Sequence, residues 1–183
     1  MAGEDKLVAP TKLSKREQEI VEDFARIFTE MDGLYADDKR RDVIRSVVAY
    51  RYGSYDPSRE RLVETPNWEV VFSLNACPNC NPLAQNMGKL MPSGESLECR
   101  VCHIRIPNEL FESARKSHET EKTLMEKQDK LDEKLEKYGI KGEQLEKIIK
   151  IAEDRADAEA RKKQTLEESL EKPESGGRED ETA

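Results

Sequence analysis

The chain is poor in the residues that build a large apolar core. Of its 183 residues, 36% are hydrophobic and 5% are aromatic, with a single tryptophan, whereas 38% are charged. This composition disfavours one large core and favours a small module joined to extended helices. There is no run of about 18 apolar residues and no apolar N-terminal stretch, so we expect neither a transmembrane helix nor a signal peptide.

Cysteine and histidine are also scarce, which narrows the chemistry. The four cysteines lie in one region of the chain and there are two histidines. No cysteine is left over for a disulfide framework, so we expect a soluble cytoplasmic protein with reduced thiols. There is no glycine-rich phosphate loop and no HExxH motif, and no nucleophile has a catalytic partner. We therefore expect a protein that is not an enzyme.

The four cysteines form two closely spaced pairs. Cys77 and Cys80 belong to the segment CPNC, Cys99 and Cys102 belong to CRVC, and eighteen residues separate the pairs. Two C-x2-C pairs at this spacing predict one Zn²⁺ ion with four thiolate ligands. Four cysteines leave no open coordination position, so the ion is expected to be structural. Iron held by the same four thiolates is the less favoured alternative, and His103 is expected at the rim of the site.

This pattern resembles the zinc-ribbon class, over about residues 68–107. The class occurs in transcription, translation and other nucleic-acid machinery, and the resemblance implies two metal-binding turns joined by a β-hairpin. Asn81 and His103 stand where ribbons commonly have glycine. The β-prone run 68–74 is expected to lead into the first pair as a strand, and 87–91 is expected to form another.

The segments on either side of the cysteines have helical patterns. Together they predict an α+β fold, mostly α, with a small four-cysteine zinc ribbon between an N-terminal helical pair and a C-terminal antiparallel coiled-coil hairpin. We divide the chain into a flexible tail (1–12), the helical pair with a loop (13–66), the ribbon (67–107), the hairpin (108–171) and a disordered tail (172–183).

The N-terminal pair has recognisable ends. Ser14 and Glu17 form a capping box that opens the first helix, which is expected to stop at residues 31–33. Asp37 or Asp38 caps the second helix, which is expected to end near Gly53. Each helix has an apolar stripe, and we expect the two stripes to pack against each other.

The C-terminal hairpin is predicted from two matching heptad seams. Folding the chain at residues 139–142 would place Ala114 and Ser117 opposite Leu166 and Leu170. Glu121 would then face the lysines at 162–163. A solvated monomeric hairpin is favoured over intermolecular coiled-coil pairing.

The chain has a formal net charge of −8, which argues against wrapping nucleic acid with its whole surface. One basic segment is nevertheless a candidate nucleic-acid face, because tyrosines lie near it in the sequence. Its candidate residues are Lys39, Arg40, Arg41, Arg45 and Arg51. Acidic neighbours reduce the net charge of 36–61 to +2 (seven basic minus five acidic residues), so a mixed solvated face is the favoured interpretation.

These features predict a non-enzymatic zinc-ribbon adaptor. It would dock on a nucleic-acid-processing machine through the ribbon, the arginine-rich helix and the hairpin, the last contacting a protein partner. The alternative is an assembly protein in which zinc only stabilises a protein-interaction hub. Neither a membrane nor a small-molecule substrate is expected as a partner.

Overall fold

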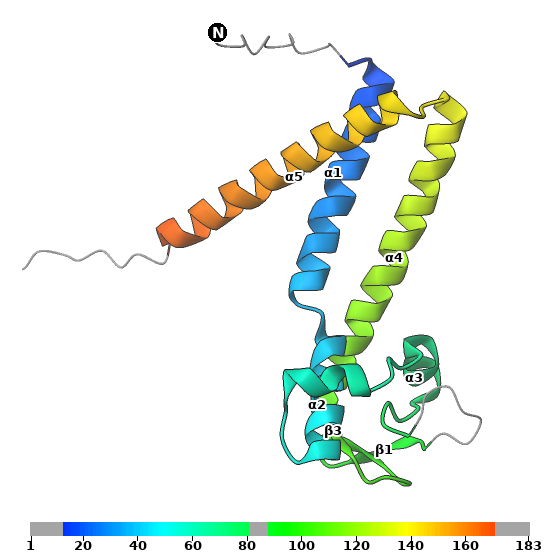
Figure 1. Cartoon of the computed structure of the whole chain (residues 1–183), viewed down its shortest axis with the longest axis vertical. Helices are drawn as coiled ribbons and strands as arrows, with labels where there is room; N and C mark the ends of the chain where they lie inside the picture. Colours follow the sequence, from blue (N-terminus) through cyan, green and yellow to red (C-terminus); the bar gives the residue numbers. More distant parts are fainter. Residues whose placement is uncertain (1–12, 81–87, 171–183) are drawn as a thin grey trace, which may run out of the picture. The chain divides into compact units, whose positions relative to one another are not determined.

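The computed structural model describes residues 13–80 and 88–170, and the two predicted tails lie outside the described residues. The described chain is mostly helical, with one small antiparallel sheet (Figure 1). No helix in these ranges is both long enough and apolar enough to cross a membrane. The elements are α1 (Lys15–Ala36), α2 (Lys39–Tyr52), the 3-10 helix η1 (Pro57–Leu62), α3 (Trp68–Leu74), β1 (Leu90–Ser93), β2 (Ser96–Cys99), β3 (Arg105–Pro107), α4 (Asn108–Tyr138) and α5 (Glu143–Leu170).

The helix ends have mostly local causes. The capping box at the start of α1 is confirmed, because the backbone N–H of Ser14 donates to Glu17 at 2.7 Å and that of Glu17 donates to Ser14 Oγ at 3.3 Å. Asp38 caps α2 by accepting from the N–H of Arg40, and Gly53 ends that helix with φ of +78°. The expected stop at residues 31–33 is wrong, since α1 continues through Gly33 to Ala36.

The run 68–74 is a helix, α3, and not the expected strand. Asn67 caps it by accepting from the N–H of Val70 at 3.2 Å, and Asn75 ends it in the left-handed conformation at φ of +49°. Short apolar runs fit either type of element, and here the two asparagine caps favour the helix.

The sheet has the order β1-β2-β3, and both pairings are antiparallel. Leu90 pairs with Cys99, and Leu97 pairs with Ile106. Gly94, with φ of +63°, forms the turn between β1 and β2. The expected strand at 87–91 is displaced towards the turn, since β1 spans Leu90–Ser93, and residue 87 lies outside the described residues.

The chain divides into two compact units. Unit 1 comprises residues 1–30 and 128–183, and unit 2 comprises residues 31–127. The boundaries fall within α1 and α4, which contribute to both units. The five segments expected from the sequence remain a prediction, because these units are defined by packing and cut across two of them, 13–66 and 108–171.

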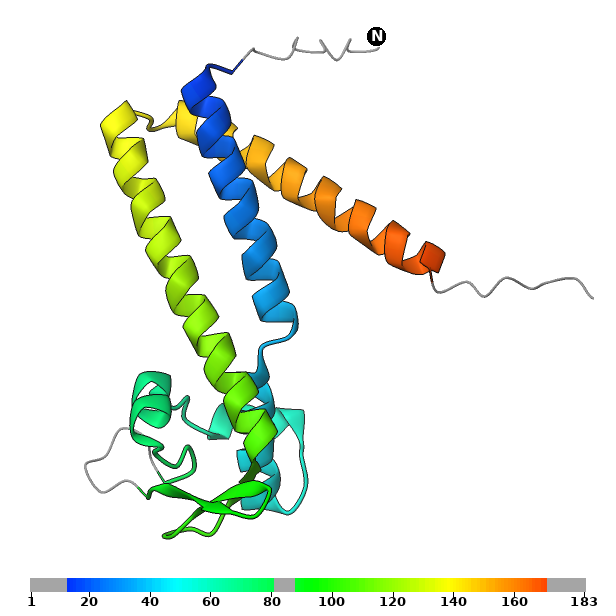
Figure 2. The ribbon, with the colours of Figure 1, turned by 180° about the vertical axis from the view of Figure 1, so that it is seen from behind.

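Unit 1 contains the start of α1, the end of α4 and the whole of α5. Lys134 of α4 forms ion pairs with Glu19 and Asp23 of α1, and Gln144 of α5 donates to Glu17 of α1 at 2.8 Å. In Figures 1 and 2, α5 crosses the start of α1 and then diverges from it. The buried apolar side chains of the unit come from all three helices and their connection: Ile20, Val21, Ala25, Ile27, Leu131, Leu135, Ile140, Ile148, Ala152 and Ala156. Both α4 and α5 therefore make polar contacts with α1, and all three helices contribute buried apolar side chains to the unit.

The full-length coiled-coil hairpin is accordingly not confirmed. The two helices and the glycine turn are present, with positive φ at Gly139 and Gly142. Ala114, however, is buried in the core of unit 2, and Leu166 is 62% exposed. The side chain of Leu170 lies outside the described residues. Heptad spacing marks an apolar stripe on each helix but does not identify which helix covers it.

Unit 2 has a core shared by α2, α3, the sheet and the first turns of α4. Its buried members are Val43, Val47, Val48, Val63, Val71, Phe72, Cys77, Leu90, Cys99, Ile104, Ile106, Phe111 and Ala114. The expected packing of the α2 stripe against the α1 stripe is wrong. The valines of α2 belong to this core, whereas the buried residues of α1 up to residue 30 belong to unit 1.

A buried ion-pair cluster fixes the start of α2 in unit 2. The Arg40 side chain is 8% exposed and contacts the carboxylates of Asp38 and Glu121. Burial alone would raise the pKa of Asp38, but hydrogen bonds from the Arg40 side chain and backbone outweigh it and hold the pKa below its usual range. Arg40, for its part, has its pKa raised by its hydrogen bond with Asp38.

We expect Asp38→Asn to destabilise unit 2 by about 3 kcal/mol, because it leaves a buried guanidinium with one carboxylate instead of two. Asparagine preserves the helix cap, so Asp38→Ala should cost about 1 kcal/mol more. Since folding lowers the pKa of Asp38, its stabilisation exists above the unfolded pKa of about 4 and disappears as pH falls through the folded value. Urea unfolding of both variants between pH 3 and 7 measures this; variants that match the unmodified chain at pH 7 would contradict it.

Candidate metal centre

The four cysteine sulfurs lie together as the spacing predicted. Cys77 Sγ is 3.6 Å from Cys102 Sγ, and Cys80 Sγ is 3.5 Å from Cys99 Sγ. All four sulfur atoms lie within 4.8 Å of one another. In a tetrahedron with metal–sulfur bonds of about 2.3 Å, the sulfurs are about 3.8 Å apart. The four side chains therefore fit a tetrahedral metal ion.

Each pair forms a turn that points backbone N–H groups at its first sulfur. Cys77 accepts hydrogen bonds from the backbone of Asn79 and Cys80. Cys99 accepts equivalent bonds from the backbone of Val101 and Cys102, with the Val101 nitrogen at 3.4 Å. Such donors offset the negative charge of a thiolate. The two turns thus share one local pattern of hydrogen bonds to the first cysteine of each pair.

The thiol pKa values reflect the competition between burial and these donors. Burial is the largest influence on Cys77 and raises its pKa. Burial, together with the neighbouring Cys102 and Cys99 side chains, raises the pKa of Cys80 to about 11. Burial would also raise the pKa of Cys99, but its backbone donors prevail and lower it to about 7. Cys99 is therefore the thiol that deprotonates most readily among these three, while a bound cation would favour the thiolate form of every ligand.

Gly88 completes the site, although it was not among the residues chosen from the sequence. Its carbonyl accepts from the N–H of Cys77 at 2.7 Å, which brings its Cα close to the sulfurs. A Cβ atom here would lie 2.4 Å from Cys99 Sγ and 3.0 Å from Cys80 Sγ. Only glycine leaves room for the cysteines in this arrangement.

The end of α2 holds both turns from outside. Tyr50 donates its hydroxyl hydrogen to the carbonyl of Cys102. Arg51 donates to the side-chain oxygen of Asn79 at 2.6 Å and to its carbonyl at 2.9 Å. Adjacent residues of one helix thus contact the two metal-binding turns, and outer partners of this kind orient metal ligands.

Removing these outer contacts is expected to weaken metal binding. Tyr50→Phe and Arg51→Gln should each lower metal affinity about tenfold. This is the typical effect of mutating a residue that holds a metal ligand in position without binding the metal itself. Competition with a chromophoric chelator measures the change. Tyr52→Phe is the matched control, because the described contacts of Tyr52 involve its ring rather than its hydroxyl group. Unchanged affinity in both variants would mean that the two turns hold their geometry without α2.

His103 lies beside the site but outside the cluster of candidate ligands. It has φ of +62°, and its backbone N–H donates to the carbonyl of Cys99 at 2.9 Å. Its side chain is 71% exposed, with Nδ1 at 3.5 Å from Glu98. His103 thus adopts the backbone conformation that glycine commonly provides, and its ring faces a carboxylate.

The five basic residues proposed for nucleic-acid contact have different surroundings. Arg40 is buried between Asp38 and Glu121, and Arg51 is bonded to Asn79. Lys39 pairs with Asp37 and Asp42, and Arg45 also pairs with Asp42. Arg41 is exposed. Intramolecular contacts therefore occupy Arg40 and Arg51 most fully, and Arg41 is the candidate best placed to meet an external phosphate.

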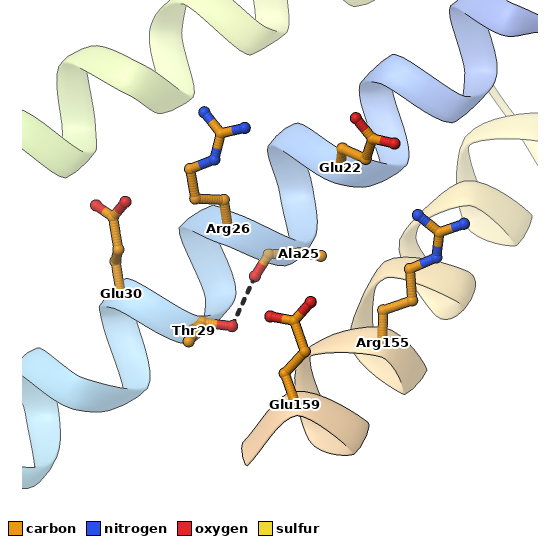
Figure 3. Close-up of a pocket in the computed structure, with 7 residues that line it drawn as sticks. All are labelled: Glu22, Ala25, Arg26, Thr29, Glu30, Arg155 and Glu159. Carbon is orange, nitrogen blue, oxygen red and sulfur yellow. Dashed lines mark hydrogen bonds between the residues drawn. The ribbon is translucent and has the colours of Figure 1, made fainter. Parts of the chain in front are cut away.

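A second hollow lies in unit 1, between α1 and α5. The pocket measures 480 Å³. Two small residues of α1, Ala25 and Thr29, line it together with five charged residues (Figure 3): Glu22, Arg26, Glu30, Arg155 and Glu159. The close-up shows a hydrogen bond from Thr29 Oγ1 to the carbonyl of Ala25, within α1. The lining has three glutamates and two arginines, a net charge of −1, and includes neither a cysteine nor a histidine, so this groove presents no soft metal ligand.

Comparison of the chain with protein-family models, with curated proteins and with solved structures finds no match. The functional interpretation therefore rests on the residues and on their geometry.

Proposed function

We propose that this chain is a non-enzymatic, zinc-stabilised adaptor that assembles other proteins. One observation carries the proposal: the four sulfurs form a closed set of ligands, and both of their turns are bonded to the end of α2. A metal in such a site would have no open position for a substrate. Its effect would be to fix α2, the sheet and α4 around one core.

The donor atoms support zinc as the ion. Four thiolates suit zinc or iron and do not suit magnesium or calcium, which prefer oxygen. The short distances and backbone donors fit a closed tetrahedral site, and zinc is the usual occupant of such structural sites. The zinc-ribbon resemblance stated for 68–107 is consistent with the antiparallel pairing of β1 and β2 between the two cysteine pairs, although α3 replaces the expected first strand.

The remaining polar groups support a role without catalysis. The cysteines are taken up by the metal site, and His118 contacts Glu69, which also pairs with Lys122. The helices, by contrast, offer exposed surface, because every side chain of α5 from 157 to 167 is exposed. Long exposed helices are suited to contacting protein partners, and α4 and α5 are the elements we assign to this task.

Affinity purification with and without nuclease tests the proposal. Metal analysis of the same material should find one zinc ion per chain. Protein complexes that survive nuclease treatment support the adaptor function, and they should disappear when the helix surface of α5 is altered by Arg155→Glu and Arg161→Glu. A chain recovered without any protein partner, or one with turnover that a single Glu→Gln change removes, would refute the proposal.

Nucleic-acid docking is the second candidate because of an aromatic–arginine surface around α2 and η1. The Arg59 guanidinium lies 4.8 Å from the centre of the Tyr52 ring, and Arg45 lies 5.7 Å from that of Tyr55. Arginine and exposed aromatic rings can contact phosphates and bases. Arg41→Glu combined with Arg45→Glu should then weaken RNA or DNA binding at least about tenfold and reduce its salt dependence. The pair Arg155→Glu and Arg161→Glu, with the same change of charge on α5, is the control.

A further inference from the structure

Unit 2 contains a pocket of 450 Å³ that the metal site does not use. Residues of α2, of the segment from η1 to α3, and of α4 line it. Its apolar surface comes from Ile44, Val63 and Trp68. The Trp68 ring stacks on Phe72 at 5.5 Å and is half-buried, so it lines the pocket from a fixed position.

One end of this pocket is acidic. Arg40 is placed there with two carboxylates, those of Asp38 and Glu121, so these three side chains have a net charge of −1. The Glu121 side chain is 30% exposed, so a cation that enters the pocket can still approach its carboxylate.

The other charged groups of the lining have opposite signs. Glu60 accepts a hydrogen bond from the Tyr55 hydroxyl at 2.7 Å, and Arg41 is exposed. The lining therefore has three carboxylates and two guanidiniums, a net charge of −1. A ligand that fits has a cationic head and a slender apolar stem.

We propose that this pocket receives an arginine or lysine side chain from a partner protein. The methylene stem would lie on Ile44 and Val63, the cation would contact the Trp68 ring, and the carboxylates would balance its charge. The net charge of −8 on the whole chain favours encounter with a basic partner. The inference rests on the proposed adaptor function and specifies the chemistry of its partner.

Trp68 makes the test direct, because it is the only tryptophan in the chain and its emission reports on the pocket. The full-length, zinc-loaded protein is titrated with Nα-acetyl-arginine amide and, separately, with Nα-acetyl-citrulline amide, which has nearly the same shape and no charge. We expect saturable binding of the arginine probe, at least about fivefold tighter than that of citrulline. Equal binding of the two probes, or binding of neither, would overturn the proposal.

Two single-charge variants sharpen the result because they should act in opposite directions. Glu60→Gln should weaken binding of the arginine probe about threefold to tenfold, and Arg41→Gln should strengthen it by a similar factor. Arg41 is exposed and Glu60 is half-buried, and thermal melts check that the fold is unchanged. If adenosine monophosphate binds instead and Arg41→Gln abolishes its binding, the pocket is an anion site and the proposal fails. Nuclease-resistant protein complexes that Glu60→Gln leaves intact would mean that the adaptor function holds and that another surface docks the partner.

Discussion

Replacing Gly88 with alanine is expected to abolish tight metal binding. The added Cβ atom would lie 2.4 Å from Cys99 Sγ and 3.0 Å from Cys80 Sγ, well inside normal contact distance. Both neighbours are candidate ligands, so the clash can be relieved only by displacing a thiolate or the backbone at 88. Metal–ligand distances tolerate changes of only about 0.2 Å. We expect metal affinity to fall at least about 100-fold. This is the upper end of the range found when residues that support the metal ligands are mutated.

Competition with a chromophoric chelator measures this loss, and Gly33→Ala is the matched control. Nothing lies within 4 Å of a Cβ atom at Gly33, which is inside α1. Alanine there should leave metal affinity unchanged and stabilise the helix by about 1 kcal/mol. If Gly88→Ala binds zinc as tightly as the unmodified chain, the close approach of this backbone to the sulfurs is not required by the site.

Cys99→Ser is expected to unfold the core of unit 2. Cys99 is fully buried, pairs with Leu90 across the sheet and accepts two backbone hydrogen bonds. Serine leaves three thiolates, and structural zinc sites contribute about 10–16 kcal/mol of apparent binding free energy to folding. Loss of half of that, about 5–8 kcal/mol, is comparable to the whole stability of a small domain, which is about 5–15 kcal/mol. The fixed packing of Trp68 against Phe72 should disappear, while the helices of unit 1 should largely persist.

Near-ultraviolet circular dichroism and Trp68 emission follow unit 2, and far-ultraviolet dichroism follows the remaining helix. Val101→Ser is the control, because Val101 lies in the same turn, receives the same new side chain and is 67% exposed. It should change stability by no more than about 0.5 kcal/mol. A Cys99→Ser protein that keeps the native near-ultraviolet spectrum without metal would show that the core folds independently of the ion.

The clustering of the four cysteines could be predicted because the spacing of the two pairs is a local property of the sequence. Gly88 could not be found this way, since its importance comes from a through-space approach to Cys99 and Cys80. The contacts made by Tyr50 and Arg51 likewise join positions that are 52 and 28 residues apart. The one sequence signal for them was the tyrosine- and arginine-rich end of α2, which suggested nucleic acid rather than support of the metal site.

The positions of the helices were predicted more reliably than the helices against which each of them packs. α4 ends at Tyr138, directly before the fold expected at 139–142, and Asp38 caps the start of α2 and Gly53 its end, as expected. Periodicity reveals which face of a helix is apolar, but several helices with similar faces compete for each surface. In unit 1 the start of α1 contributes buried side chains and polar contacts alongside α4 and α5, an arrangement that pairing two heptad seams alone does not consider.

The division into units has a consequence for the order in which the chain gains its stability. Unit 2 is one continuous stretch, 31–127, whereas unit 1 is made of two stretches on either side of it. Once unit 2 has folded, the long loop between the two halves of unit 1 is already closed. Unit 1 then folds without the entropic cost of closing a loop of about 100 residues, which is on the order of 4 kcal/mol. A metal ion that stabilises unit 2 would in this way also favour the folding of unit 1. During synthesis, the whole of unit 2 would leave the ribosome before α5 does.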